Sequence, residues 1–207
     1  MNTLVVQSLL HLAATLGRAL VSIGLALIFA LPLGLLFGRH KEWGRAFRPL
    51  TYVLYTVPKI SLFPLALLLF GLNDKARIFI VALVLFFQFL IAIRDGVLDI
   101  PEASFKVLKG LGAGFTDRFR FLIFPAILPR LLTALRIGSA AALSVLFFTE
   151  TSAVGEYGLG KMCIDAWTSL KYPEMALSVI LTILAGFLLF GFFWRQEKKF
   201  LRYKKDF

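Results

Sequence analysis

One stretch of this sequence comes close to a known chemical motif. Residues 155–161 read GEYGLGK, which nearly matches the glycine-rich loop that cradles nucleotide phosphates. That loop needs Ser or Thr after the lysine to bind magnesium, and this chain has Met162 there. A strand must also precede the loop, and none is expected here. The sequence therefore argues against nucleotide binding at this stretch.

Other reactive residues are sparse. Cys163 is the one cysteine, which excludes an intramolecular disulfide and a cysteine metal site. His11 and His40 lie too far apart in the sequence to form a local ligand pair. No cluster of His, Cys and Asp and no nucleophile–base pair is present. We therefore expect a protein that is not an enzyme and that holds no metal or cofactor of its own.

The elements that must position the remaining polar groups are long apolar runs. Hydrophobic residues make up 59% of the 207 residues, and the mean hydropathy is +0.83. A soluble core of this size does not need so many apolar residues, so the excess must face lipid. The predicted fold is an all-α, polytopic membrane protein with five transmembrane helices in a single domain, residues 1–207. The spans are expected at about 14–38, 50–72, 76–94, 130–150 and 174–194, and residues 4–16 form either an interfacial helix or an extension of the first span.

The basic residues give the expected orientation of these spans. The formal net charge is +11, but the basic residues sit between the apolar runs, which argues against nucleic-acid binding. With five spans, seventeen Lys and Arg fall on the side of the C-terminal tail and five on the other side. The tail is therefore predicted to be cytoplasmic and the N-terminus to lie outside, with no cleaved signal peptide.

Lys59 is the charged residue that lies deepest in a predicted span. It sits about nine residues into the span, roughly 13 Å along a helix, close to the bilayer midplane. A charge at this depth costs about 2.5–3.5 kcal/mol on insertion scales, so something must offset it. Either Lys59 is solvated in an inner vestibule, or it lines a substrate path, with Ser61, and attracts an anionic group.

The stretch between the third and fourth predicted spans, residues 95–129, has a different character. It is rich in Gly and Pro, and residues 101–115 follow a helical period of about 100° per residue. One half of this helix would carry Pro101, Ser104, Phe105, Leu108, Leu111, Gly112 and Phe115; the other half would carry Glu102, Lys106, Lys109 and Ala113. It is too short and too charged to span a bilayer, so we expect an amphipathic helix at the membrane surface.

Three segments of the chain resemble binding-protein-dependent ABC import permeases. Residues 95–138 are similar to the cytoplasmic signature loop of these proteins, with Gly112-Ala113 at its Gly-Ala step and Pro129 at its downstream Leu-Pro. Residues 56–71 and 147–162 resemble two further segments of the permeases for nitrate, taurine, aliphatic sulfonates and thiamine precursors. Those permeases usually carry one more N-terminal span, so we expect this chain to form the five-span core.

The signature loop departs from the family pattern at one place. Counted back from Gly112, the signature Glu falls on Lys106 and its two alanines on Val107 and Leu108. Glu102-Ala103 looks similar but lies four residues too early. The position of the loop therefore matches the family, while its contact chemistry differs.

The resemblance implies a mechanism. The amphipathic helix would be a coupling helix that docks on cytoplasmic ABC ATPase subunits, which bind the ATP. The implied coupling residues are Pro101, Lys106, Lys109, Gly110, Gly112, Ala113 and Pro129. The further implied partners are a second permease copy, an extracytoplasmic substrate-binding protein and the lipid of a bacterial inner membrane.

Two questions stay open from the sequence. Glu150, at the outer end of the fourth span, is either a solvated helix terminus or a residue for gating or for contact with the binding protein. A stand-alone channel or secondary transporter is the alternative function. Five spans that contain no inverted repeat argue against a secondary transporter.

Overall fold

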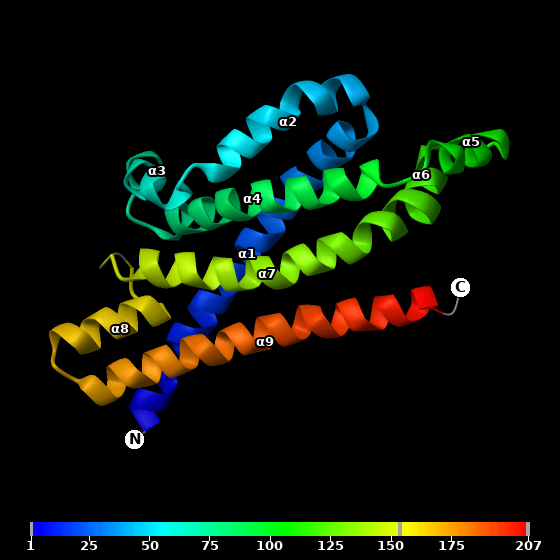
Figure 1. The fold of residues 1–207 in the computed structure, drawn as a ribbon. Helices are drawn as coiled ribbons and strands as arrows, with labels where there is room; N and C mark the ends of the chain where they lie inside the picture. The colour runs from blue at the N-terminus through cyan, green and yellow to red at the C-terminus, as the bar shows by residue number, and fades with distance from the viewer. Residues whose placement is uncertain (1, 153–154, 206–207) are drawn as a thin grey trace. The chain divides into compact units, whose positions relative to one another are not determined.

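The computed structural model describes residues 2–152 and 155–205, and most of this part is helical (Figure 1). The elements in chain order are α1 (Asn2–Arg39), α2 (Lys41–Thr56), a 3-10 turn (Lys59–Leu62), α3 (Phe63–Phe70), α4 (Asp74–Leu98), α5 (Glu102–Gly110), α6 (Phe115–Arg118), a π-helical turn (Phe119–Ile123), α7 (Phe124–Glu150), α8 (Leu159–Thr168) and α9 (Tyr172–Lys205).

Four of the described helical stretches are long and apolar enough to cross a membrane: Leu4–Arg39, Asp74–Leu98, Phe115–Glu150 and Tyr172–Phe200. A fifth crossing is present if Pro49–Thr56 and Lys59–Phe70, which meet at 74°, count as one broken span. The prediction of an all-α polytopic membrane protein is thus confirmed. The predicted count of five spans is reached only if the two helical pieces of the second span are counted as one crossing.

Local sequence explains the break in the second span. Pro58 disfavours the helical conformation of the residue before it, and Val57 is extended, with φ −61° and ψ 129°. The chain then makes one 3-10 turn, and Pro64 stands in the first turn of α3, where a missing N–H does no harm. Gly71, with φ +80°, ends α3.

Two further boundaries differ from the expected ones. Helix α1 begins at Asn2, so residues 4–16 extend the first span and do not form a separate interfacial helix. The helical region that contains the fourth span begins at Phe115, within the stretch 95–129 expected as a loop. Its start is capped, because Gly114 N donates to Asp117 Oδ2 at 3.1 Å.

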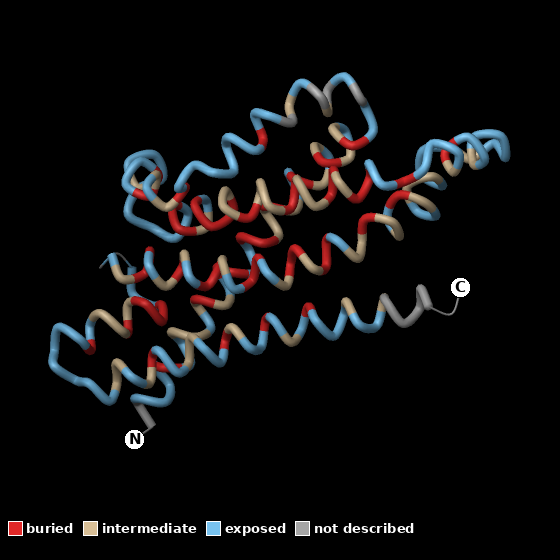
Figure 2. Tube along the Cα trace, in the orientation of Figure 1, coloured by how far each residue is buried: buried red, intermediate tan, exposed pale blue. Residues whose placement is uncertain are grey.

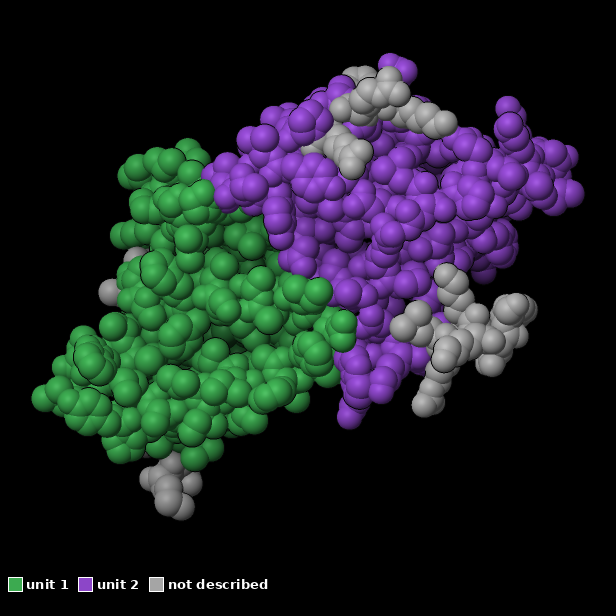
Figure 3. All heavy atoms as spheres, viewed as in Figure 1, with its two compact units in different colours: residues 1–26, 58–85, 136–192 green, residues 27–57, 86–135, 193–207 purple. Residues whose placement is uncertain are grey.

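The chain divides into two compact units, coloured separately in Figure 3. Unit 1 comprises Met1–Ala26, Pro58–Leu85 and Arg136–Phe192, and unit 2 comprises Leu27–Val57, Phe86–Leu135 and Phe193–Phe207. A small apolar cluster of Phe63, Ala66, Ala76 and Ile80 packs α3 against α4 within unit 1.

Unit 2 contains a close helix–helix contact built on small residues. In α1, Gly34 and Gly38 are four residues apart and face α4. A Cβ atom at Gly34 would lie 2.8 Å from Ile93 Cβ, and one at Gly38 would lie 2.5 Å from Val97 Cβ. Only glycine allows this approach, as in other membrane helix pairs with this spacing. Along α4, buried residues recur through the length of the helix (Figure 2).

Candidate functional site

Six of the seven implied coupling residues lie together, on α5 and the turn that follows it. Pro101 caps the N-terminus of α5, and Lys106, Lys109 and Gly110 are exposed along the helix. Gly112 is exposed in the turn, and Ala113 beside it is half-buried. These six residues therefore lie on one short segment of the chain, residues 101–113, and five of them are exposed.

The end of α5 has the geometry that glycine favours. Gly112 has φ +76°, its N–H donates to Lys109 O at 3.1 Å, and Ala113 N donates to Leu108 O at 3.0 Å. This pair of bonds is the Schellman motif, which satisfies the last helical carbonyls. A Cβ atom at Gly112 would meet no described atom within 4 Å. The choice of residue at position 112 is therefore restricted by the positive φ and not by lack of space for a side chain.

One aromatic residue anchors α5. The Phe105 side chain is buried, and the Arg39 guanidinium lies 3.7 Å from the centre of its ring. The helix ends at Gly110, so Leu111 and Phe115 do not continue its buried side as the helical period predicted. They are 77% and 70% exposed. Val107 is also exposed, and α5 thus presents apolar groups beside its lysines.

Pro129 does not belong to this surface. It lies inside α7, half-buried, and its carbonyl accepts a hydrogen bond from Thr133 Oγ1 at 3.1 Å. Pro129 therefore lies in α7, apart from the other six implied coupling residues on α5 and its following turn.

Lys59 and Ser61 lie at the break of the second span. Lys59 is the first residue of the 3-10 turn, and its side chain is buried. Ser61 is exposed, and its hydroxyl donates to Pro58 O at 2.7 Å, which satisfies one of the carbonyls freed by the break. Both residues thus belong to one irregular turn.

Glu150 is at the centre of a buried polar cluster in unit 1. Its side chain is 0% exposed, so the interpretation as a solvated helix terminus is wrong. Arg18 Nη1 donates to Oε1 at 2.7 Å, and Gly160 N donates to Oε2 at 3.1 Å. The Thr15 hydroxyl is shared between the two oxygens at 3.0 and 2.9 Å. The carboxylate therefore joins the end of α7 to α1 and to the start of α8.

The cluster continues from Glu150 to α4 through arginine side chains. Arg18 Nη2 pairs with Asp74 Oδ1 at 2.9 Å, and Arg77 Nη1 donates to the same oxygen at 3.0 Å. Arg77 Nε also donates to the Thr149 carbonyl at 3.4 Å. Two arginines and two carboxylates thus balance in charge, which offsets part of the cost of burying Arg18, Arg77 and Glu150, while Asp74 is half exposed.

The stretch that resembled a phosphate-binding loop wraps around this cluster. Arg18 Nη1 also donates to Tyr157 O at 2.7 Å, and His11 Nδ1 lies 2.8 Å from Gly158 O. Gly158, with φ +153°, lies so close to Glu150 that a Cβ would be 2.5 Å from its carboxyl carbon. Gly158 and Gly160 therefore leave space for the Glu150 carboxylate, where a phosphate-binding loop would leave space for a nucleotide.

Gly160→Ala is expected to destabilise the protein. The new methyl group would overlap the backbone carbonyl oxygen of Phe147 and lie 2.9 Å from Glu150 Cβ. Overpacking of this kind costs about 1–3 kcal/mol. Thermal unfolding in detergent measures the loss. Gly24→Ala is the control, because its Cβ would meet no described atom within 4 Å; equal melting temperatures for the two variants would contradict the packing described.

Sequence reasoning singled out Glu150 but missed its partners. Arg18, Thr15, Asp74 and Arg77 are distant from it in sequence, and only the fold brings them together. A signal was present, because charged residues at or within apolar spans normally need partners.

Comparisons with known proteins agree with the family resemblance. A sequence profile of proteins described as "Binding-protein-dependent transport system inner membrane component" matches residues 13–199. The taurine transport system permease protein TauC of Escherichia coli (strain K12) is 28% identical over 179 residues. The nitrate import permease protein NrtB of Leptolyngbya laminosa is 31% identical over 180 residues, and the putative aliphatic sulfonates transport permease protein SsuC of Bacillus subtilis (strain 168) is 26% identical over 197 residues.

These alignments cover most of this chain but less of the relatives. The alignments with TauC and NrtB each cover 86% of this chain, and the alignment with SsuC covers 95% of it. The chain spans 65% of TauC, 64% of NrtB and 71% of SsuC. The fold is similar to a chain of the MetNI methionine ABC transporter in an inward-facing conformation. That match has a TM-score of 0.76 at 18% identity and covers 97% of this chain and 99% of the other.

Proposed function

Since this chain belongs to the family of binding-protein-dependent transport system inner membrane components, we propose that it is the permease subunit of an ATP-driven importer. The observation that supports this most is α5, an exposed amphipathic helix that lies between two spans and is followed by a turn at Gly112. Such a helix can dock into a cleft of a partner protein. The chain would act as a single transmembrane domain and hydrolyse no ATP.

The assembly that we propose contains two permease copies and two cytoplasmic ATPase subunits, with a substrate-binding protein on the outer side. Each ATPase would contact α5 of one permease copy. Closure of the ATPase pair on ATP would then switch the permease pair between inward-open and outward-open states. The charge bias of the sequence supports a cytoplasmic C-terminus in the inner membrane.

For the cargo, we propose a small molecule with an anionic group. The relatives named for taurine, nitrate and aliphatic sulfonates support this class. Lys59 supports it independently, because a buried ammonium in an irregular turn is suited to attract a sulfonate or nitrate. Lys59 and Ser61 would then line the path, and Glu150 would hold the outer end of the helices in place beside it.

Reconstitution tests this function against the stand-alone alternatives. The chain is placed in liposomes with its ATPase and binding protein, and uptake of labelled taurine, nitrate and an alkanesulfonate is measured with and without ATP. We expect uptake only when ATP and ATPase are on the side of α5. Uptake that follows an ion or substrate gradient without the ATPase would instead indicate a channel or a secondary transporter.

Lys106→Glu is expected to weaken binding of the ATPase. The family signature has Glu at this position, so a partner matched to Lys106 should present an acidic group there. Like charges at an interface are costly, and we expect assembly to weaken roughly ten-fold at low salt and less at high salt. Lys75→Glu is the matched control, because Lys75 is exposed and lies on the proposed outer side. Equal assembly of both variants at low salt would make Lys106 an ordinary solvated residue.

Lys59→Met is expected to abolish uptake while the protein inserts and assembles normally. Removing a charge from a span favours insertion by about 2.5–3.5 kcal/mol, so poor expression should not explain the loss. Lys59→Arg should keep part of the activity, because it keeps the positive charge. Initial uptake rates of the two variants decide the matter. A wild-type rate for Lys59→Met would show that Lys59 does not line the path. Lys59 would then give no support for an anionic cargo.

A further inference from the structure

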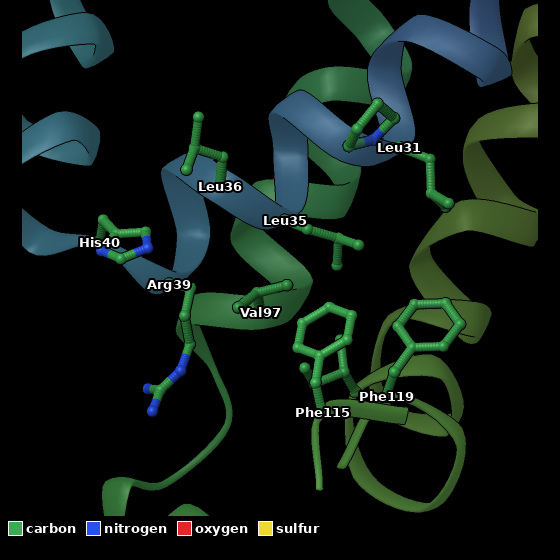
Figure 4. Close-up of a pocket in the computed structure, with 10 residues that line it drawn as sticks. Leu31, Leu35, Leu36, Arg39, His40, Val97, Phe115 and Phe119 are labelled. Atoms are coloured by element: carbon green, nitrogen blue, oxygen red, sulfur yellow. The ribbon is translucent and has the colours of Figure 1, made fainter. Parts of the chain in front are cut away.

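An apolar cavity of about 490 Å³ opens in unit 2 (Figure 4). Its wall consists of Leu31, Pro32, Leu35, Leu36, Arg39, His40, Val97, Phe115, Phe119 and Ile123. The volume falls within the range of roughly 300–1,000 Å³ that is common for small-molecule sites. Unlike the coupling surface, this cavity has no part in the function proposed above.

Two helical stripes form the wall. Leu31 and Leu35 are four residues apart near the end of α1, and Phe115, Phe119 and Ile123 follow the same spacing through α6 and the π-helical turn. The rings of Phe115 and Phe119 point toward Leu35 (Figure 4). A wall so poor in polar groups offers water almost no partners, so water is a poor occupant of this cavity.

Two lining residues are polar: Arg39, the last residue of α1, and His40, which follows it. Among the described side chains, no carboxylate forms an ion pair with either of them. Asp99 lines a neighbouring cavity that shares Arg39, but its carboxylate pairs with Arg130. The Arg39 guanidinium, which lies over Phe105, therefore keeps hydrogen-bond donors for an outside anion.

We propose that this cavity holds an acyl chain of an anionic phospholipid, with the phosphate bound by Arg39 and His40. The occupant must combine a long apolar part with a negative head, because the wall is apolar and its end is basic. A chain that spans a bilayer meets such molecules directly. Under the orientation proposed above, the C-terminal end of α1 lies at the cytoplasmic leaflet, where anionic lipids are enriched.

Native mass spectrometry of the full chain, with all subunits that purify with it, tests this site. The purified protein is titrated with phosphatidylglycerol and, separately, with phosphatidylcholine of the same acyl chains. Leu35→Trp fills the cavity, and Ile28→Trp is its control, because Ile28 is 67% exposed on the same helix and does not line the cavity. Arg39→Gln removes the cation, and Arg120→Gln is its control, an exposed arginine of the π-helical turn.

The proposal predicts a distinct result for each variant. Leu35→Trp should lose one tightly held phosphatidylglycerol per chain, while Ile28→Trp keeps it. Arg39→Gln should weaken phosphatidylglycerol roughly five-fold, as expected for one cation near an anionic lipid, and should leave phosphatidylcholine unchanged. Arg120→Gln should change neither.

Three results would overturn the proposal. Leu35→Trp could retain as much phosphatidylglycerol as Ile28→Trp, or the wild-type protein could bind both lipids equally well. The wild-type protein could also hold no lipid tightly, in which case a second copy or another subunit covers the cavity. If Leu35→Trp fails to fold, the comparison of Arg39→Gln with Arg120→Gln still decides whether Arg39 selects an anionic lipid.

Discussion

Glu150→Gln is expected to lower the melting temperature of the detergent-solubilised protein by roughly 10 °C, because the variant leaves Arg18 buried without its nearest counter-charge. The shape of the side chain is kept, so the effect isolates the charge. Arg18 Nη1 lies 2.7 Å from Oε1, and both side chains are at least nine-tenths buried. Breaking a buried pair by removing one partner costs about 3–5 kcal/mol.

Two further variants separate the ion pair from general damage to this region. Glu156→Gln removes a charge from the exposed part of the same loop and should leave the melting temperature within about 2 °C of the wild type. The double variant Arg18→Met with Glu150→Gln removes both charges and should recover part of the loss. A melting temperature for Glu150→Gln as high as that of Glu156→Gln would contradict the cluster described.

Gly112→Val is expected to reduce coupled transport at least ten-fold, with normal insertion. Valine is strained at φ +76°, so the turn that ends α5 would have to open and the bonds from Gly112 N and Ala113 N would be lost. The docking surface of α5 would then change shape while the spans stay intact. Uptake and co-purification of the ATPase measure the two effects separately.

The matched control for this variant is Gly114→Val. Gly114 lies two residues away with φ −70° and ψ −178°, a conformation that valine adopts readily. Gly112→Asn is a second comparison, because Asn tolerates a positive φ better than other non-glycine residues. We expect both to transport well. Full transport by Gly112→Val would show that α5 is not the coupling element.

The parts of the fold that could be predicted depend on local sequence. The spans follow from apolar runs, and the break of the second span follows from Pro58, whose effect reaches only Val57 and its neighbours. The helix α5 follows from its period. The end of α5 was misplaced because the periodic pattern continues through Leu111 and Phe115, whereas Gly112 turns the chain.

The parts that could not be predicted depend on distant contacts. Arg18 and Glu150 are 132 residues apart, and no spacing rule joins them. The close contact of Gly34 and Gly38 with Ile93 and Val97 likewise cannot be predicted until the arrangement of α1 and α4 is known. The apolar cavity of unit 2 is lined in part by the π-helical turn, and the sequence pattern does not reveal that turn.

The mass of the intact complex tests the central claim most directly, since it requires no knowledge of the cargo. The chain is purified from its native membrane in mild detergent, and its assembly is weighed and dissociated into subunits. Our account predicts two copies of this chain with two copies of an ATP-binding subunit, and weaker retention of that subunit by Lys106→Glu at low salt. A complex that contains one copy of this chain, or that contains no ATP-binding subunit, would contradict this account.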